Sequence, residues 1–336
     1  MPVCFSHDWS GDEGDCLDIG LVNNMPGKAL QATERQFLTL LDSAAHDVRV
    51  RLWLYALPDV PRTTSGQRHI DSFYSSIDHL WDRPLDGLIV TGMEPRASNL
   101  MDEPHWASMT RLIEWADRNT CSTIWSCLAA HAAVLHTDGI ARRRFSEKRF
   151  GLFECDRISD HQLVAGVPST VILPHSRWND VPEAELTACG YRVLTRARDA
   201  GADIFVKQRK SLFVFLQGHP EYDANTLQLE YIRDVGRFLR RESDKYPALP
   251  LDYFDRDTAT ALTALQARAL CDPREELLAE MNALTARHRA NRWRSPAVRI
   301  YCNWLAYLHD AKALRSGMQS FSKAAVEQII AERATV

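Results

Sequence analysis

The 336-residue sequence predicts an α/β protein with three layers, in which a mostly parallel sheet is covered by helices on both faces. Two observations predict this class. Short apolar runs bounded by turn-forming residues recur along the chain, as expected for buried strands. Segments with apolar residues at helical spacing separate these runs, and parallel strands need such crossover connections.

The first half of the chain carries four of the expected strands. They are DIGLV (18–22), VRVRLWLY (48–55), DGLIVTG (86–92) and STIWS (122–126). Two helices are expected between them. One places Leu30, Phe37, Leu38, Leu41 and Ala45 on a single face, and the other spans residues 103–118. This strand–helix alternation is typical of a parallel sheet.

The second half carries four more expected strands, at 170–173, 191–197, 203–208 and 211–218. Because the last three are joined by short connections, we expect them to pair antiparallel. A helix is expected to follow at 225–240.

A change in composition after Arg241 predicts the domain organisation. The Pro-rich, aromatic segment YPALPLDYF leads into a helical region at 259–288, broken near Pro273. An aromatic segment at 293–308 is expected to pack on the core, and residues 320–334 to form another short helix. We therefore divide the chain into an N-terminal tail (1–16), a main domain (17–245) and a helical C-terminal extension (246–336).

Charge and composition exclude several classes of function. The net charge of −4 gives no reason to expect a nucleic-acid partner. The N-terminus lacks the apolar stretch of a signal peptide, and no apolar run is long enough to span a bilayer. We therefore expect a cytoplasmic protein with no membrane partner. The eight cysteines form no CxxC pair and no zinc-like cluster, so no metal and no cofactor are expected, and most are interpreted as buried apolar side chains.

Cys127 differs from the other cysteines because it stands between an apolar strand and a helix, in STIWS-C-LAAHAAVLH. Ligands of α/β sheets bind at the carboxyl ends of the strands. The following helix offers free backbone N–H groups and the positive end of its dipole, which favour a thiolate and can bind an oxyanion. Position alone leaves two interpretations open, a nucleophile or a buried structural cysteine.

His219 and Glu221 follow another apolar strand, in SLFVFLQ-GHPEYD. In extended backbone, residues i and i+2 face the same way, so the Glu221 carboxylate can accept the imidazole N–H of His219 and fix its tautomer. The other ring nitrogen is then free to act on a thiol or hydroxyl. Together with the strand–Cys–helix pattern, this arrangement favours a Cys–His–carboxylate catalytic site over a solvent-facing turn.

The order strand–Cys–helix, then strand–Gly-His-Pro-Glu, resembles class I glutamine-amidotransferase-like (flavodoxin-like) folds. Other segments resemble the homoserine O-succinyltransferase family over roughly residues 17–310. These segments are NNMP (23–26) before TERQFLTLL, LDGLIVTG (85–92), PHSRWND (174–180), GHPEYDANTLQLEYIRDV (218–235) and CNWLAYL (302–308).

The resemblance implies a ping-pong acyltransferase of methionine biosynthesis and a homodimer. Acyl-CoA would acylate Cys127, and the hydroxyl of L-homoserine would then take the acyl group. By the same resemblance, His219 is the general base and Glu221 its partner. Lys148 is a substrate-binding lysine, Ser176 lines the acceptor pocket and Arg233 holds the carboxylate of the acceptor. The oxyanion would be bound by the N–H of Leu128 and, by fold analogy, the N–H of Met93.

The loop MEPRASNL after Gly92 departs from the family pattern. The position that tracks the acyl donor in the family is Arg96 here. An arginine there can pair with the free carboxylate of a succinyl group or with Glu94, so succinyl is preferred and acetyl stays open. The run Arg142–Arg144 is either a solvated loop or a site for CoA phosphates.

Three alternatives to homoserine acylation stay open. The acceptor could be serine or another hydroxy amino acid. A glutamine amidotransferase or hydrolase on the same fold is a second alternative, although SCLAAH lacks the glycines that usually surround the nucleophile of a glutaminase. The third is a non-catalytic relative, against which the intact Cys, His and Glu argue.

Overall fold

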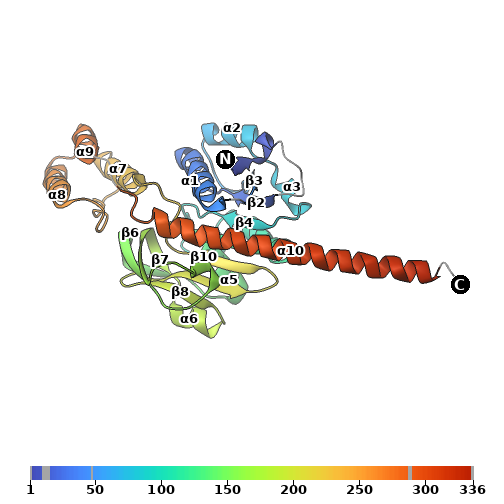
Figure 1. Cartoon of the computed structure of the whole chain (residues 1–336). Coiled ribbons are helices and arrows are strands. Elements are labelled where there is room, and N and C mark those ends of the chain that lie inside the picture. Colours follow the sequence, from blue (N-terminus) through green and yellow to red (C-terminus); the bar gives the residue numbers. More distant parts are fainter. Residues whose placement is uncertain (1, 10–15, 47, 287–289, 334–336) are drawn as a thin grey trace.

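A computed structural model describes residues 2–9, 16–46, 48–286 and 290–333, with side chains except at position 28 and beyond 315. The strands are β1 (Val3–Phe5), β2 (Leu17–Val22), β3 (Val50–Tyr55), β4 (Gly87–Val90), β5 (Ser122–Ser126), β6 (Arg143–Arg157), β7 (Thr170–Asp180), β8 (Arg192–Ala197), β9 (Gly201–Gln208) and β10 (Leu212–Leu216). The helices are α1 (Gly27–Ala45), α2 (Thr64–Phe73), α3 (Ile77–Trp81), α4 (Trp106–Asn119), α5 (Leu128–Asp138), α6 (Glu183–Ala188), α7 (Thr226–Leu239), α8 (Arg256–Cys271), α9 (Leu277–Thr285) and α10 (Arg294–Arg333). Figure 1 shows their arrangement.

The described strands form one sheet of ten, in the order β1-β3-β2-β4-β5-β10-β9-β8-β6-β7. The first six strands in this order pair parallel, and β10 through β7 pair antiparallel. The antiparallel patch expected in the second half is therefore confirmed. It begins at β10, which pairs parallel with β5 on one side and antiparallel with β9 on the other.

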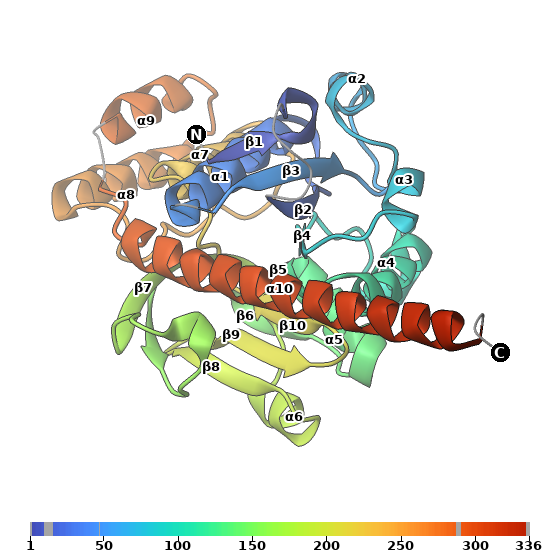
Figure 2. The ribbon, with the colours of Figure 1, turned by 45° about the vertical axis from the view of Figure 1, so that its right-hand side comes forward.

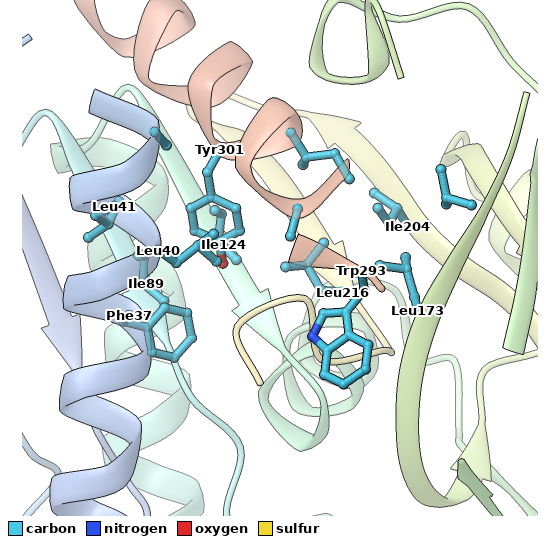
Figure 3. Close-up of a cluster of buried hydrophobic side chains, with 14 of the residues drawn as sticks. Phe37, Leu40, Leu41, Ile89, Ile124, Leu173, Ile204, Leu216, Trp293 and Tyr301 are labelled. Carbon is cyan, nitrogen blue, oxygen red and sulfur yellow. The ribbon is translucent and has the colours of Figure 1, made fainter. Parts of the chain in front are cut away.

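Successive side chains of the central strands pack into two separate hydrophobic cores, because strand residues alternate between the two faces of the sheet. Ile89 and Ile124 pack with Phe37 of α1 and Tyr301 of α10 on one face (Figure 3). Trp125, the next residue of β5, packs on the other face with side chains of α4 and α5. Helices thus cover both faces of the sheet, and the expected three-layer α/β fold is confirmed.

Two parts of the sheet were not expected from the sequence. β1 pairs with β3, so part of the segment 1–16, expected to be a tail, is an edge strand. β6 begins at Arg143, so most of the arginine run 142–144 lies in a strand and not in a loop. Its first half is charged and largely exposed, and there it pairs only with β7. Apolar patterning therefore could not reveal it.

The C-terminal extension is tied to the sheet by backbone and side chains. Leu251 bridges to Gly151 of β6, and α8 and α9 reproduce the expected helical region with its break before Pro273. The two segments expected at 293–308 and 320–334 form one continuous helix, α10, which runs beside α1 and continues beyond the body of the molecule (Figure 2). None of the described helices combines the length and the apolar character that crossing a bilayer requires.

Candidate active site

Cys127 occupies a strained turn between β5 and α5. Its φ is 52° and its ψ is −115°, a conformation that a residue with a Cβ rarely adopts. The backbone N–H of Cys127 donates to the carbonyl of Leu216 at the end of β10, at 2.7 Å, which fixes the turn. Strain of this kind is characteristic of a nucleophile held at the end of a strand. Cys127 is half-buried.

The backbone near Cys127 leaves room for an oxyanion site. Leu128 is the first residue of α5, where helix N–H groups lack intrahelical acceptors. Gly92, in the loop that follows β4, lies against Leu128: a Cβ added to Gly92 would come within 2.9 Å of the Leu128 nitrogen. A glycine at position 92 therefore keeps access to this N–H open, and Met93 follows directly. The structure brings both predicted oxyanion residues to the same end of the sheet as Cys127.

His219 reaches the same place from β10. Because β5 and β10 are paired in parallel, with Ser126 opposite Leu216, the turns that follow them are neighbours. The His219 N–H donates to the carbonyl of Pro174 at 2.8 Å, and only 9% of the residue is exposed. Cys127 and His219, 92 positions apart, are thus brought close enough for the cysteine to raise the pKa of the imidazole.

The electrostatics of His219 depend on Glu221 and Cys127. Nδ1 of His219 lies 2.8 Å from Oε1 of the buried Glu221 carboxylate. Burial disfavours the charged imidazole, but the carboxylate and the cysteine sulfur outweigh it and hold the pKa of His219 well above its usual value. A cationic imidazole next to the sulfur stabilises a thiolate. The geometry of the expected Cys–His–carboxylate site is therefore present.

Tyr222 and Glu230 connect this group to the predicted acceptor residues, and the sequence did not single them out. The Tyr222 ring stacks on the His219 imidazole with a centroid separation of 4.3 Å. Its hydroxyl donates to Glu230 Oε1 at 2.6 Å. Both residues lie in the segment 218–235, so the resemblance marked the segment without giving them a role.

Three predicted acceptor residues surround Glu230. The Ser176 hydroxyl donates to Glu230 Oε2, and Lys148 Nζ lies 3.6 Å from the same oxygen. Arg233 is half exposed and bonds Asp234 Oδ1 at 2.8 Å, with Glu230 Oε2 at 3.9 Å. The structure thus brings together side chains from β6, β7 and α7. It forms a polar, charged surface next to His219, and the role of each residue stays a prediction.

A cavity of about 230 Å³ opens in the loop after Gly92 and is lined by Asn24, Met93, Arg96, Glu103 and His105, among others. Arg96 is exposed, and its backbone N–H donates to Glu103 Oε1 at 2.7 Å. Glu94, the alternative partner considered for Arg96, pairs instead with Arg237, at 3.4 Å. The Arg96 side chain is therefore placed at a cavity next to the predicted oxyanion residue.

The arginine run at 142–144 contributes one residue to this loop. Arg142 Nη2 donates to the carbonyls of Ala97 and Ser98, at 3.2 and 3.1 Å. Arg144 stacks over Trp178 on the neighbouring strand β7. Arg143 pairs with Glu185 of α6. All three arginines thus have intramolecular contacts that a solvated loop would not supply.

A second group of chemically active side chains, Cys155, His175 and Asp203, lies within the sheet. Their ligand atoms lie within 4.8 Å of one another, a proximity that sequence spacing could not reveal because three strands supply them. Burial lowers the pKa of His175 well below its usual value, so the ring is neutral. Its Nδ1 accepts from Arg177 Nε at 3.2 Å, and its Nε2 therefore carries the proton and faces Asp203 Oδ1 at 3.3 Å.

This buried group supports the active-site turn. Nδ1 of His175 accepts a hydrogen bond and Nε2 carries the proton. The ring therefore has no free lone pair to bind a metal or to deprotonate Cys155. Burial raises the pKa of the Cys155 thiol, which has no exposed surface. Asp203 Oδ1 also accepts the backbone N–H of Gly218 at 3.1 Å. The group therefore acts as a polar network beneath His219.

The other cysteines only partly match the expectation of buried side chains. Cys16, Cys121 and Cys155 are buried, whereas Cys4, Cys189 and Cys302 are half-buried and Cys271 is exposed. The exposed position lies at the end of α8, where one face of the helix is in solvent.

Comparison with known proteins gives a consistent family assignment. The family model described as homoserine O-succinyltransferase matches residues 6–313. A homoserine O-succinyltransferase of Rhodopseudomonas palustris is 49% identical over 293 residues, which is 87% of this chain and 88% of that protein. One of Methylorubrum extorquens is 45% identical and covers 89% of each chain. One of Bradyrhizobium japonicum is 44% identical and covers 88% of this chain and 90% of that protein.

The similar solved structures are more distant. A glutamine amidotransferase from Methylobacillus flagellatus has a TM-score of 0.48 and 14% identity, covering 87% of this chain and 95% of that one. A glutamine amidotransferase from Thermotoga maritima has a TM-score of 0.45 and 11% identity, covering 88% and 99%.

Proposed function

The chain belongs to the homoserine O-succinyltransferase family, and we propose that it transfers a succinyl group from succinyl-CoA to the hydroxyl of L-homoserine, a step of methionine biosynthesis. The observation that carries the proposal is the contact of Cys127 with a His219 whose imidazole is bound to Glu221. We expect the protein to act in the cytoplasm and as a homodimer, which size-exclusion chromatography with light scattering would test.

The proposed reaction has two half-reactions. The Cys127 thiolate attacks the thioester carbonyl of the acyl-CoA, and the C–S bond to CoA breaks. His219 gives its proton to the departing CoA thiolate. His219 then takes the proton of the acceptor hydroxyl, the oxygen attacks the acyl-cysteine, and the Cys127 thiolate leaves. In both tetrahedral intermediates the oxyanion is placed at the N–H groups of Leu128 and Met93.

The two substrates would bind at different sides of the same site. Lys148, Ser176 and Arg233 lie on the β6–β7–α7 side, where a guanidinium can bind the carboxylate of an amino acid through two hydrogen bonds. Arg96 lies at the cavity beside Met93, where it can bind the terminal carboxylate of a succinyl group. This placement favours succinyl over acetyl as the donor.

Intact-mass spectrometry after incubation with succinyl-CoA, acetyl-CoA or glutamine tests the proposal. We expect a succinyl adduct that is absent in Cys127→Ser, kept in Cys155→Ser and discharged by homoserine. Adduct loss in Cys155→Ser alone would move the nucleophile to the buried group. A glutamine-derived adduct with none from acyl-CoA would support an amidotransferase, and discharge by serine rather than homoserine would change the acceptor.

Replacement of the proposed base is the second test. His219→Ala should lower turnover at least ~100-fold, the usual scale for loss of a general base. Full turnover in this variant would remove His219 from the mechanism.

A further inference from the structure

The segment that enters α10 holds a backbone carbonyl of the active-site turn. Trp293 Nε1 donates to the carbonyl of Tyr222 at 2.8 Å, and Asn291 Nδ2 donates to the same oxygen at 3.2 Å. Trp293 is 1% exposed and belongs to the same core as Leu216, the last residue of β10, and Leu173 of β7 (Figure 3). Two side-chain donors from about 70 residues away thus converge on one carbonyl.

Tyr222 in turn limits how the His219 ring can lie. The two rings are nearly parallel, with an interplanar angle of 12°, and the Tyr222 N–H donates to the His219 carbonyl at 3.1 Å. The Tyr222 hydroxyl is held by Glu230. The carbonyl, the N–H, the ring and the hydroxyl of Tyr222 all have partners. These contacts fix the position of Tyr222, and the imidazole packs against its ring.

Glu221 fixes one atom of the imidazole but not its plane. The bond from Nδ1 to Oε1 still permits rotation of the ring about that bond, which would move Nε2 away from the Cys127 sulfur. Contact with the Tyr222 ring removes this freedom. The plane of the imidazole is therefore set by Tyr222, and the position of Tyr222 is set by the residues that hold its carbonyl.

We propose that Trp293 and Asn291 are positioning residues that hold the Tyr222 carbonyl and thereby keep the His219 imidazole in line with Cys127. The C-terminal extension thus completes the active site without touching a substrate. The kinetic part of this inference rests on the proposed acyl transfer, whereas its effect on the Cys127–His219 pair does not.

A matched control lies on α10, the helix that Trp293 precedes. Trp304 is also 1% exposed, and its Nε1 donates to Ser122 Oγ at 3.0 Å, at the start of β5 and away from the turn that bears Cys127. Trp293→Phe and Trp304→Phe remove the same N–H and the same volume from the same layer. A merely structural role for Trp293 predicts equal consequences for both variants.

The readout is the pH dependence of alkylation of Cys127 by iodoacetamide, followed by peptide mass spectrometry in the full-length protein. Exposed Cys271 serves as the internal reference thiol. In Trp293→Phe we expect the Cys127 alkylation profile to shift to higher pH relative to the wild-type chain, which slows alkylation about tenfold at fixed pH. In Trp304→Phe we expect no movement. Equal profiles in both variants would overturn the inference.

Kinetics and a second variant complete the test. With succinyl-CoA and homoserine, Trp293→Phe should lower kcat about 10-fold to 100-fold with little change in either KM, because only the orientation of the base is lost. Asn291→Ala, at a half-buried position, should shift the alkylation profile in the same direction by a smaller amount. If Trp293→Phe does not fold, this second variant tests the positioning role. If neither succinyl-CoA nor acetyl-CoA is used at all, the proposed function fails while the alkylation result still decides the positioning role.

Discussion

Oε1 of Glu221 lies 2.8 Å from Nδ1 of His219, and both residues are nearly buried. Pro220 stands between them in a turn that the bond from the Tyr222 N–H to the His219 carbonyl closes, and this turn brings the two side chains together. The short contact means that Nδ1 carries a proton and donates it in a hydrogen bond to the carboxylate. Nε2 is then the ring nitrogen that can act on Cys127. Glu221 therefore both raises the pKa of the His219 imidazole and positions its ring.

Glu221→Gln should change stability in a pH-dependent way. Burial lowers the pKa of His219, but Glu221 and Cys127 raise it, and the net pKa lies above the ordinary 6.5. A raised folded-state pKa gives stability that is complete below about pH 6.5 and is lost as the pH rises through the folded value. We expect the deficit in the free energy of unfolding of the variant to be largest below about pH 6.5 and to narrow at alkaline pH. Urea melts across pH would show this, and a pH-independent difference would contradict it.

Gly92→Ala should block the oxyanion site and displace the backbone at the start of α5. The added Cβ would lie 2.9 Å from the Leu128 nitrogen, which covers an N–H that the transition state needs. We expect kcat to fall about 100-fold, the scale for loss of one oxyanion donor. The control is Gly66→Ala on α2, where the added Cβ would lie 3.4 Å or more from every neighbouring atom. Unchanged kcat in Gly92→Ala would place the oxyanion elsewhere.

Arg233→Ala should separate the two half-reactions. The guanidinium lies beside the proposed acceptor surface, so its loss should raise the KM for homoserine about tenfold or more, the scale of a charge-assisted hydrogen bond. The rate of Cys127 acylation by succinyl-CoA should stay the same, as measured by rapid quench and intact mass. Arg240→Ala, an exposed arginine just beyond α7 that pairs with Glu242, is the control. A slowed acylation step would argue against an acceptor role.

Gly151→Ala should break the backbone bridge between Leu251 and β6. Gly151 has φ +137°, and an added Cβ would lie 2.2 Å from the Leu251 nitrogen, which bonds the Phe150 carbonyl. We expect a loss of at least about 2 kcal/mol in the free energy of unfolding. Gly190→Ala has φ +81° but meets no atom within 4 Å, so it reports backbone strain alone. Equal losses in the two variants would mean that the bridge to Leu251 adds nothing.

Local pattern was sufficient for the elements that carry the chemistry. The strand before Cys127 and the strand before His219 are continuous apolar runs, because both are buried on both faces in the centre of the sheet. The i, i+2 relation of His219 and Glu221 is also local, so their contact could be predicted from spacing. By contrast, β6 could not be predicted, because half of it is a charged ribbon paired only with β7.

The sequence by itself determined the alternation of strands and helices, the strained cysteine turn and the His219–Glu221 pair, since each depends on residues close along the chain. Only the tertiary structure decided which distant residues meet. The parallel pairing of β5 with β10 joins Cys127 to His219, three separate strands bury Cys155 with His175 and Asp203, and the entry to α10 places Trp293 on Tyr222. The reason is physical: register and helix packing are set by the burial of whole faces, which a pattern along one segment does not record.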